Sequence, residues 1–149
     1  MANQNIIYSQ DDLKKLSYYE NLVKIQSVLR GIFPDFPYNF CNLSARVVFL
    51  TLDLPEVGGH LYNLSGVKLT KANWHAFNHD PENRVFVCLT AYQYNSIFSD
   101  TNFPEITVIP DSFAYFLPIL KYTQFQRNLN LNPFGLEDVL NELKNVLKN

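Results

Sequence analysis

The sequence predicts an α+β fold in a single domain, residues 1–149, with N-terminal helices packed on a mostly antiparallel sheet and a C-terminal helix. Three observations support this class. Apolar residues recur at helical spacing over residues 9–31 and again over residues 136–148. Between them, short aromatic and β-branched runs separated by turn residues extend from residue 60 to about residue 109.

The composition is that of a folded protein without an obvious polyanionic partner. Hydrophobic residues make up 47% of the chain and aromatic residues 15%, enough for an aromatic-rich core. The net charge is only -2, and no basic cluster is present, so nucleic-acid binding is not expected. No apolar run approaches the ~18 residues that a membrane helix needs.

The N-terminal residues and the cysteine count indicate where the protein works. The opening segment "MANQNIIYSQDDLKK" lacks the order of charged and apolar regions found in a secretory signal. Two cysteines are too few for a disulfide framework. The expected location is therefore the cytoplasm, although a protein exported by a signal-independent route would have the same features.

The N-terminal half predicts two helices joined by an aromatic loop. Residues 9–31 form the first, with Ser9 and Asp12 suited to an N-terminal capping box and Gly31 to the stop. The loop "FPDFPYNF" has two prolines within four residues, which excludes a helix. A second helix is expected to begin at Cys41 or Asn42 and to end before Pro55, although its β-branched residues leave a strand open.

The second half predicts a sheet. Gly58-Gly59 indicates a turn, and strands are expected over residues 60–69, 74–79, 84–92 and 105–110, while residues 112–126 are ambiguous. Residues 74–89 form the clearest hairpin, because a polar loop of four to five residues separates two apolar runs.

Cys41 and His75 are the residues best suited to chemistry. A cysteine at the start of a helix lies beside unpaired backbone N–H groups, which stabilise a thiolate and lower its pKa. A histidine on a neighbouring strand can then serve as general acid and base. A buried cysteine at such a position is more often a small hydrophobic residue without a catalytic role.

Three short motifs resemble the papain-like cysteine hydrolases, in particular their compact transglutaminase-like and bacterial-peptidase-like branch. The motifs are "FCNLSARVV" with Cys41, "NWHAFN" with His75, and "VCLTAYQY", which is similar to the family's "DxTxxQF" run. The resemblance covers about residues 35–97. It implies a papain-like core, a nucleophilic Cys41, a His75 that shuttles the proton, and no cofactor.

The chain departs from this family pattern at Cys88, which occupies the position of the family's aspartate. A thiol orients an imidazole less well than a carboxylate, because sulfur is a weak acceptor. Asn78 or Asp80 could take over the third position, or a Cys–His pair could work alone. The third alternative is a site that has lost its activity and left a binding module.

Amide side chains are the candidates for stabilising an oxyanion or for orienting the site. Asn39 lies just before Cys41, Gln26 lies on the first helix, and Gln93 resembles the family's glutamine. Surface solvation is the simpler role for Asn39 and Gln26, and a structural amide for Gln93.

The remaining candidates are weaker. His60 is expected in an exposed loop, and His79 is expected to bond the turn at Asp80-Pro81 or to face water. No C-x-x-C or H-E-x-x-H spacing predicts a metal site, and no glycine-rich motif predicts a phosphate site.

Two functions from different classes follow. The first is a papain-like thiol hydrolase or acyltransferase acting on an amide in a peptide or protein substrate, either a peptide bond or a glutamine side chain. The second is a non-catalytic interaction protein on the same scaffold, with "FPDFPYNF" as an exposed contact surface. A structural domain whose resemblance to the family is coincidental is a third alternative.

Overall fold

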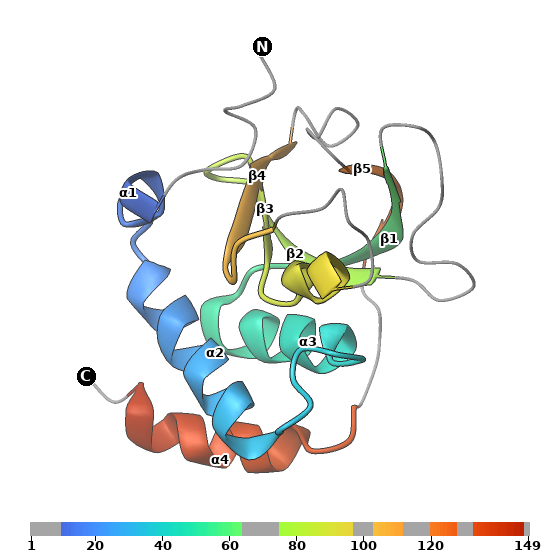
Figure 1. Ribbon diagram of the computed structural model, residues 1–149. Helices are drawn as coiled ribbons and strands as arrows, with labels where there is room; N and C mark the ends of the chain where they lie inside the picture. Colours follow the sequence, from blue (N-terminus) through green and yellow to red (C-terminus); the bar gives the residue numbers. More distant parts are fainter. Residues whose placement is uncertain (1–9, 64–74, 97–102, 112–119, 128–132, 148–149) are drawn as a thin grey trace.

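A layer of helices packs against one face of a five-stranded antiparallel sheet in the computed structural model, which confirms the α+β class (Figure 1). The structure describes residues 10–63, 75–96, 103–111, 120–127 and 133–147. The papain-like core stays an expectation, since an α+β class alone does not identify it.

The first helical segment is broken, where the sequence predicts one continuous helix. Helix α1 covers Gln10–Leu13 and helix α2 covers Tyr19–Ile32. The hydroxyl of Tyr18, in the break, donates a hydrogen bond to the Asp80 carboxylate at the end of strand β2, so a tertiary contact overrides the local helical pattern. Helix α2 continues one residue past Gly31, and Ser9 lies outside the described residues.

The second helix begins at Cys41, as predicted. Helix α3 covers Cys41–Leu52, and the strand alternative is wrong. The Thr51 hydroxyl donates to the Val47 carbonyl at 2.7 Å, one turn back, so this β-branched residue is accommodated within the helix. Asp53 then adopts a left-handed conformation (φ 59°) and ends it.

The sheet has the strand order β4-β3-β2-β1-β5, and every neighbouring pair is antiparallel. The strands are β1 (Glu56–Asn63), β2 (His75–Asp80), β3 (Val85–Cys88), β4 (Thr107–Pro110) and β5 (Leu120–Arg127).

The predicted turn at Gly58-Gly59 is wrong. Both glycines lie within β1, paired with β2 on one side and β5 on the other. The ladder hydrogen bonds of two neighbours outweigh the weak strand propensity of glycine. His60 also belongs to β1 and not to a loop.

The predicted hairpin is confirmed, but its second strand is shorter than expected. Asp80 pairs with Val85, and Asn78 pairs with Val87. The chain leaves the ladder after Cys88 and forms the short 3₁₀ helix η2 (Ala91–Ser96). The apolar pattern over residues 84–92 therefore indicates that strand β3 and the start of helix η2 are both buried, but it does not show where the strand ends and the helix begins.

The main core lies between the sheet and the helix layer. Alternate residues Val85, Val87 and Leu89 contribute to it together with buried residues of α2, α3 and α4 (Leu136–Val146). The opposite face of the sheet is also buried and carries His75, Phe77, Phe86 and Cys88. His75 and Cys88 therefore lie on the face turned away from the main core, whereas Cys41 opens a helix of the layer that packs on the other face.

The loop over residues 33–40 is mostly packed and is not the exposed aromatic surface that the sequence predicts. The rings of Phe33 and Phe40 lie 4.7 Å apart and both pack against the core, and Phe36 is buried. Tyr38 is exposed, and its hydroxyl lies 2.8 Å from the Ser96 hydroxyl. Because these aromatic rings pack on one another and on the core, they are not available as the contact surface expected for a partner.

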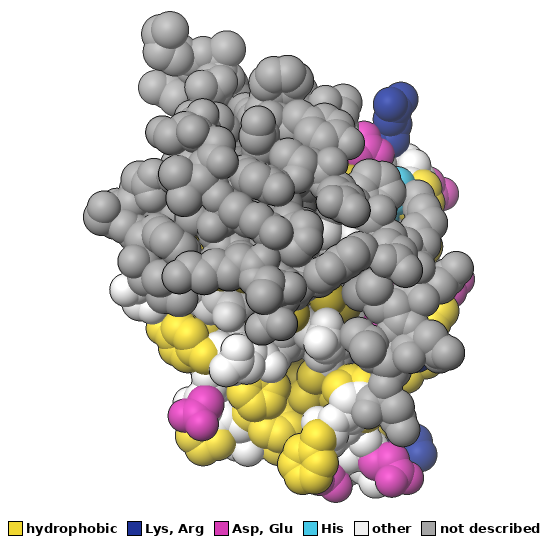
Figure 2. Space-filling model, turned by 90° about the vertical axis from the view of Figure 1, so that its right-hand side faces the viewer, with side chains coloured by type: hydrophobic (Ala, Val, Ile, Leu, Met, Phe, Trp, Pro, Cys, Tyr) yellow, Lys and Arg dark blue, Asp and Glu magenta, His cyan; other side chains and the backbone are white. Residues whose placement is uncertain are grey.

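Exposed hydrophobic side chains of the described residues are few. The large ones are Val23, Tyr38, Leu50 and Phe134. Figure 2 shows hydrophobic side chains gathered over the lower part of one face, where the helix layer lies. No helix in the described ranges is long and apolar enough to cross a membrane.

Candidate functional site

The three residues proposed for catalysis come from the ends of three elements. Cys41 is the first residue of α3, His75 is the first residue of β2, and Cys88 is the last residue of β3. Because β2 and β3 are antiparallel, the start of one lies beside the end of the other. Helix α3 packs against β2, which brings its first turn to the same end of the sheet.

His75 is fully buried, and each ring nitrogen has a polar neighbour. Nε2 lies 3.0 Å from the Cys88 Sγ, and Nδ1 lies 3.4 Å from the Tyr94 hydroxyl. The imidazole also stacks on the Phe77 ring at a centroid distance of 5.9 Å. The expected proximity of positions 75 and 88 on one face of the hairpin is therefore present.

Cys88 is surrounded by hydrogen-bond donors. Its sulfur receives the backbone N–H groups of Thr90 and Ala91, and the Thr90 hydroxyl lies 3.6 Å away. Burial nevertheless raises the pKa of the Cys88 thiol to about 11. At neutral pH Cys88 is thus a neutral thiol and cannot supply the negative charge that an aspartate would bring.

Cys41 is partly exposed and lies next to His75 through the backbone. The backbone N–H groups of Ala76, the residue after His75, and of Asn42 lie beside its sulfur, and the thiol donates weakly to the Asn42 side-chain oxygen at 4.0 Å. The N–H groups at the start of α3 therefore lie beside the sulfur, as the helix-start argument predicts. A distance of about 4 Å between Cys41 Sγ and a His75 ring nitrogen stays a prediction.

The protonation states differ from those of a preformed ion pair. Burial raises the pKa of the Cys41 thiol, and the neighbouring N–H groups offset this only in part, so the expected lowering is wrong. Burial lowers the pKa of His75 to about 3. Both groups are therefore neutral in the free protein at pH 7.

Two alternatives for the third position are ruled out by their contacts. The Asn78 amide donates to the Ala45 and Leu54 carbonyls at 3.0 Å each, on the helix side of the sheet. Asp80 lies at the far end of β2, five residues and roughly 16 Å from His75 at ~3.3 Å per residue. Its carboxylate accepts bonds from Tyr18, Glu82 and Asn83.

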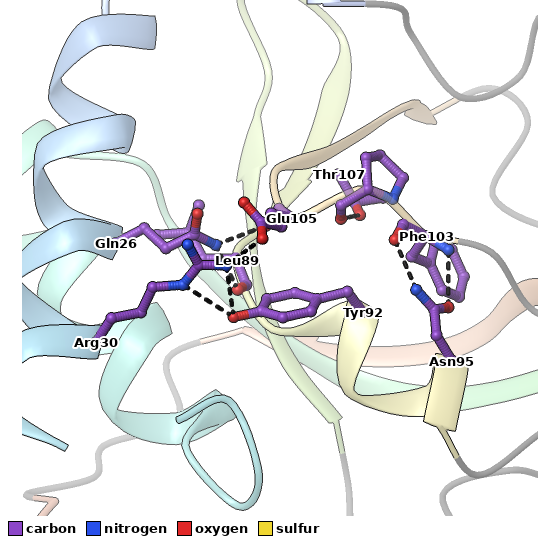
Figure 3. A network of polar contacts seen from close by, with 9 residues as sticks. Gln26, Arg30, Leu89, Tyr92, Asn95, Phe103, Glu105 and Thr107 are labelled. Atoms are coloured by element: carbon purple, nitrogen blue, oxygen red, sulfur yellow. Dashed lines mark hydrogen bonds and ion pairs between the residues drawn. The ribbon is translucent and has the colours of Figure 1, made fainter. Parts of the chain in front are cut away.

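Gln26 is a structural amide and not an oxyanion donor. Its Nε2 donates to the Leu89 carbonyl at 3.0 Å and to the Glu105 carbonyl at 2.6 Å, which uses both amide protons (Figure 3). The residue is 5% exposed, because it ties two chain segments of the sheet to helix α2.

Gln93 and Asn39, the other two amide candidates, differ in burial and in their hydrogen bonds. Gln93 is buried in η2, and its Nε2 donates to the Thr90 carbonyl at 3.0 Å, which leaves one amide proton. Asn39 is exposed in the loop before α3 and has a left-handed backbone (φ 66°). Their roles toward an oxyanion stay predictions.

His79 belongs to a separate cluster. Its Nε2 lies 2.9 Å from the Asp111 carboxylate, and Arg84 lies 3.8 Å from the same group. The expected bond to the Asp80-Pro81 turn is therefore replaced by a contact across β3 to the end of β4. Among the described residues, no group of three or more histidine, cysteine or acidic side chains is placed to hold a metal ion.

A groove in the described surface lies away from the candidate site residues. A groove of about 470 Å³ runs between α2 and α4 and is lined by Val23, Lys24, Ser27, Val28, Gly31, Ile32, Glu142 and Val146. The lining of this groove contains no cysteine or histidine.

Tyr94 is the residue that the sequence argument missed. Its ring meets the His75 ring edge-on at a centroid distance of 5.6 Å, and its hydroxyl lies at Nδ1. The signal was present, because Tyr94 directly follows Gln93 and takes the place of the phenylalanine in the "DxTxxQF"-like run.

Comparison with known proteins identifies no relative. No family model matches the chain, and neither a curated protein nor a solved structure matches it at a significant level.

Proposed function

We propose that this protein is a papain-like thiol hydrolase or acyltransferase that acts on an amide of a peptide or protein substrate. The amide is either a peptide bond or a glutamine side chain. The observation that carries the proposal is the placement of Cys41, at the first turn of α3, beside the His75–Cys88 pair. A thiol at a helix start next to an oriented imidazole is the arrangement that cysteine nucleophiles use.

The proposed reaction uses these groups in order. Cys41 gives its proton to His75 as the sulfur attacks the carbonyl carbon, and a tetrahedral oxyanion forms. The N–H groups at the first turn of α3 lie beside the sulfur, and we assign the stabilisation of this oxyanion to them. The amine then leaves with the proton from His75, and water or a second amine resolves the thioester.

The neutral resting state has a mechanistic consequence. Because the pKa of His75 is low and that of Cys41 is raised, proton transfer is unfavourable in the free protein. Substrate binding must supply the stabilisation, by placing the amide where charge develops. Thiols are kept reduced in the cytoplasm, which preserves a cysteine nucleophile, and we therefore place the protein there.

The test is acyl-enzyme trapping. The protein is incubated with a panel of peptide anilides and of peptides with glutamine side chains, followed by hydroxylamine, and hydroxamate products are measured by mass spectrometry. We expect products from the wild type, none from Cys41→Ala, and at least a hundredfold loss in His75→Gln. His79→Gln is the matched control, since His79 contacts Asp111 and not the site. Product formation that survives in Cys41→Ala contradicts the proposal.

The second candidate function is a non-catalytic interaction protein on the same scaffold. The absence of a preformed ion pair favours it, since both Cys41 and His75 are neutral. A packed 33–40 loop weakens the contact surface first expected for it. A peptide ligand that binds the wild type and Cys41→Ala equally, without turnover in either, would favour this candidate.

A further inference from the structure

Tyr94 is the polar group that faces Nδ1 of His75. Its hydroxyl lies 3.4 Å from that nitrogen, and the two rings meet at an interplanar angle of 68°. Tyr94 and Cys41 are also neighbours, since a charge on Cys41 contributes to the raised pKa of the Tyr94 phenol after burial itself. A charge on Cys41 contributes in the same way to the raised pKa of the Cys88 thiol, so Cys41 lies near the polar neighbours of both ring nitrogens.

The short helix that carries Tyr94 is held by its neighbours (Figure 3). The Tyr92 hydroxyl accepts bonds from Arg30 of α2 at 3.2 and 3.3 Å. The Asn95 amide pairs with both backbone groups of Phe103, at 2.8 Å to the N–H and 2.7 Å to the carbonyl. These contacts anchor η2 on both sides of Tyr94.

The surroundings of Cys88 indicate which ring nitrogen of His75 carries the proton. The Cys88 sulfur already receives the N–H groups of Thr90 and Ala91, so its site is built for an acceptor. The Nε2–H of His75 is then the donor across the 3.0 Å contact. A neutral imidazole has one N–H, so Nδ1 holds the lone pair and accepts the Tyr94 O–H.

We propose that Tyr94 is a positioning residue: its hydroxyl holds His75 in the Nε2–H tautomer and keeps Nδ1 unprotonated. The role rests on the proposed function, because it keeps Nδ1 as the unprotonated nitrogen, which receives the Cys41 proton when the Tyr94 hydroxyl turns away and releases the lone pair. Tyr94 donates its hydroxyl proton to Nδ1, and the Cys88 sulfur accepts the Nε2–H, so the two contacts favour the same tautomer. A phenylalanine at position 94 would fill the same space without selecting a tautomer.

The tautomer is measured directly by long-range ¹H–¹⁵N correlation of protein labelled with ¹⁵N-histidine at pH 7. The His75 signals are assigned by their loss in His75→Gln. We expect the Nε2–H form in the wild type and a mixture of both tautomers in Tyr94→Phe. Tyr18→Phe is the matched control, because it removes a tyrosine hydroxyl that bonds Asp80 at the far end of β2 from His75, and it should keep the wild-type tautomer.

Two outcomes overturn the role of Tyr94. One is an Nδ1–H signal for His75 in the wild type, which is decisive even if a variant fails to fold. The other is an unchanged tautomer in folded Tyr94→Phe. The rate of Cys41 alkylation by iodoacetamide separates this role from the proposed function. We expect it to fall at least threefold in Tyr94→Phe, whereas a tautomer change with an equally inert Cys41 in both proteins would sink the hydrolase and leave the role of Tyr94 intact.

Discussion

His75 Nε2 and Cys88 Sγ lie 3.0 Å apart across the β2–β3 hairpin, on the face of the sheet turned away from the main core. In a papain-like arrangement this is the contact at which an acceptor orients the imidazole. Here the acceptor is a neutral thiol, and the imidazole it meets is neutral as well. The pair therefore has the geometry of an orienting contact without its charge.

Replacing Cys88 with aspartate should supply that charge. A carboxylate at this position can accept the Nε2–H and the N–H groups of Thr90 and Ala91, which surround the sulfur now. A nearby negative charge favours imidazolium, so we expect a higher His75 pKa and at least tenfold faster alkylation of Cys41. NMR titration and mass mapping measure the two effects. Cys88→Ser is the neutral control, and identical values for both variants would show that charge at position 88 does not act on the imidazole.

The two cysteines should differ in reactivity. Cys41 is partly exposed, whereas Cys88 is 4% exposed and has a pKa of about 11. Thiolate fraction and access both favour Cys41, and we expect iodoacetamide at pH 6 to label it at least tenfold faster. Peptide mapping after partial labelling measures the ratio. Preferential modification of Cys88 would contradict the burial described here.

Burial of neutral His75 should make the fold sensitive to acid. Its folded pKa of about 3 lies below the ordinary value of about 6.5 in the unfolded chain. Between these values the unfolded state binds one more proton, so stability falls as the pH decreases, by up to about 1.4 kcal/mol per pH unit. Above pH 6.5 the effect vanishes.

Urea unfolding between pH 7 and pH 4.5 measures this slope. His75→Gln should flatten the decline, whatever its stability at pH 7. His79→Gln leaves the His75 imidazole in place and should keep the decline. A wild-type slope equal to that of His75→Gln would count against a buried neutral imidazole.

Two glycines of the helix layer should respond oppositely to alanine. Gly135 has φ +89°, and a Cβ there would lie 2.7 Å from the Phe33 ring, so Gly135→Ala should cost about 1–3 kcal/mol. Gly31 lies within α2 with no atom near an added Cβ, so Gly31→Ala should stabilise by about 0.5–1 kcal/mol. Urea midpoints measure both. Equal midpoints for the two variants would contradict the different backbone conformations.

Local patterns predicted much of the fold. The helix start at Cys41, the 74–89 hairpin and the amphipathic helix α4 follow from periodicity and turn residues, which act over a few positions. The break before α2 and the strand containing Gly58 depend on partners distant in sequence, Tyr18 with Asp80 and β1 with β5. Such partners are not visible in a local pattern.

The candidate site was predictable in its order but not in its electrostatics. The placement of His75 and Cys88 on one face followed from hairpin alternation. The pKa directions did not, because the sequence shows a helix start near Cys41 but not the burial that outweighs it. The structural role of Gln26 was also not predictable, because its two carbonyl partners lie 63 and 79 positions away in the sequence.

The hydrogen bonds of Gln26 connect helix α2 to the chain that directly follows strand β3. Leu89 directly follows Cys88, so the amide that holds the Leu89 carbonyl also sets where the thiol stands relative to the imidazole. The Glu105 carbonyl, held by the same amide, fixes the approach to β4. Substitutions in α2 that break these bonds should therefore alter the reactivity of the site, even though α2 supplies none of its reacting groups. A substitution at Gln26 would change the distance between Cys88 Sγ and His75 Nε2 without replacing any reacting group.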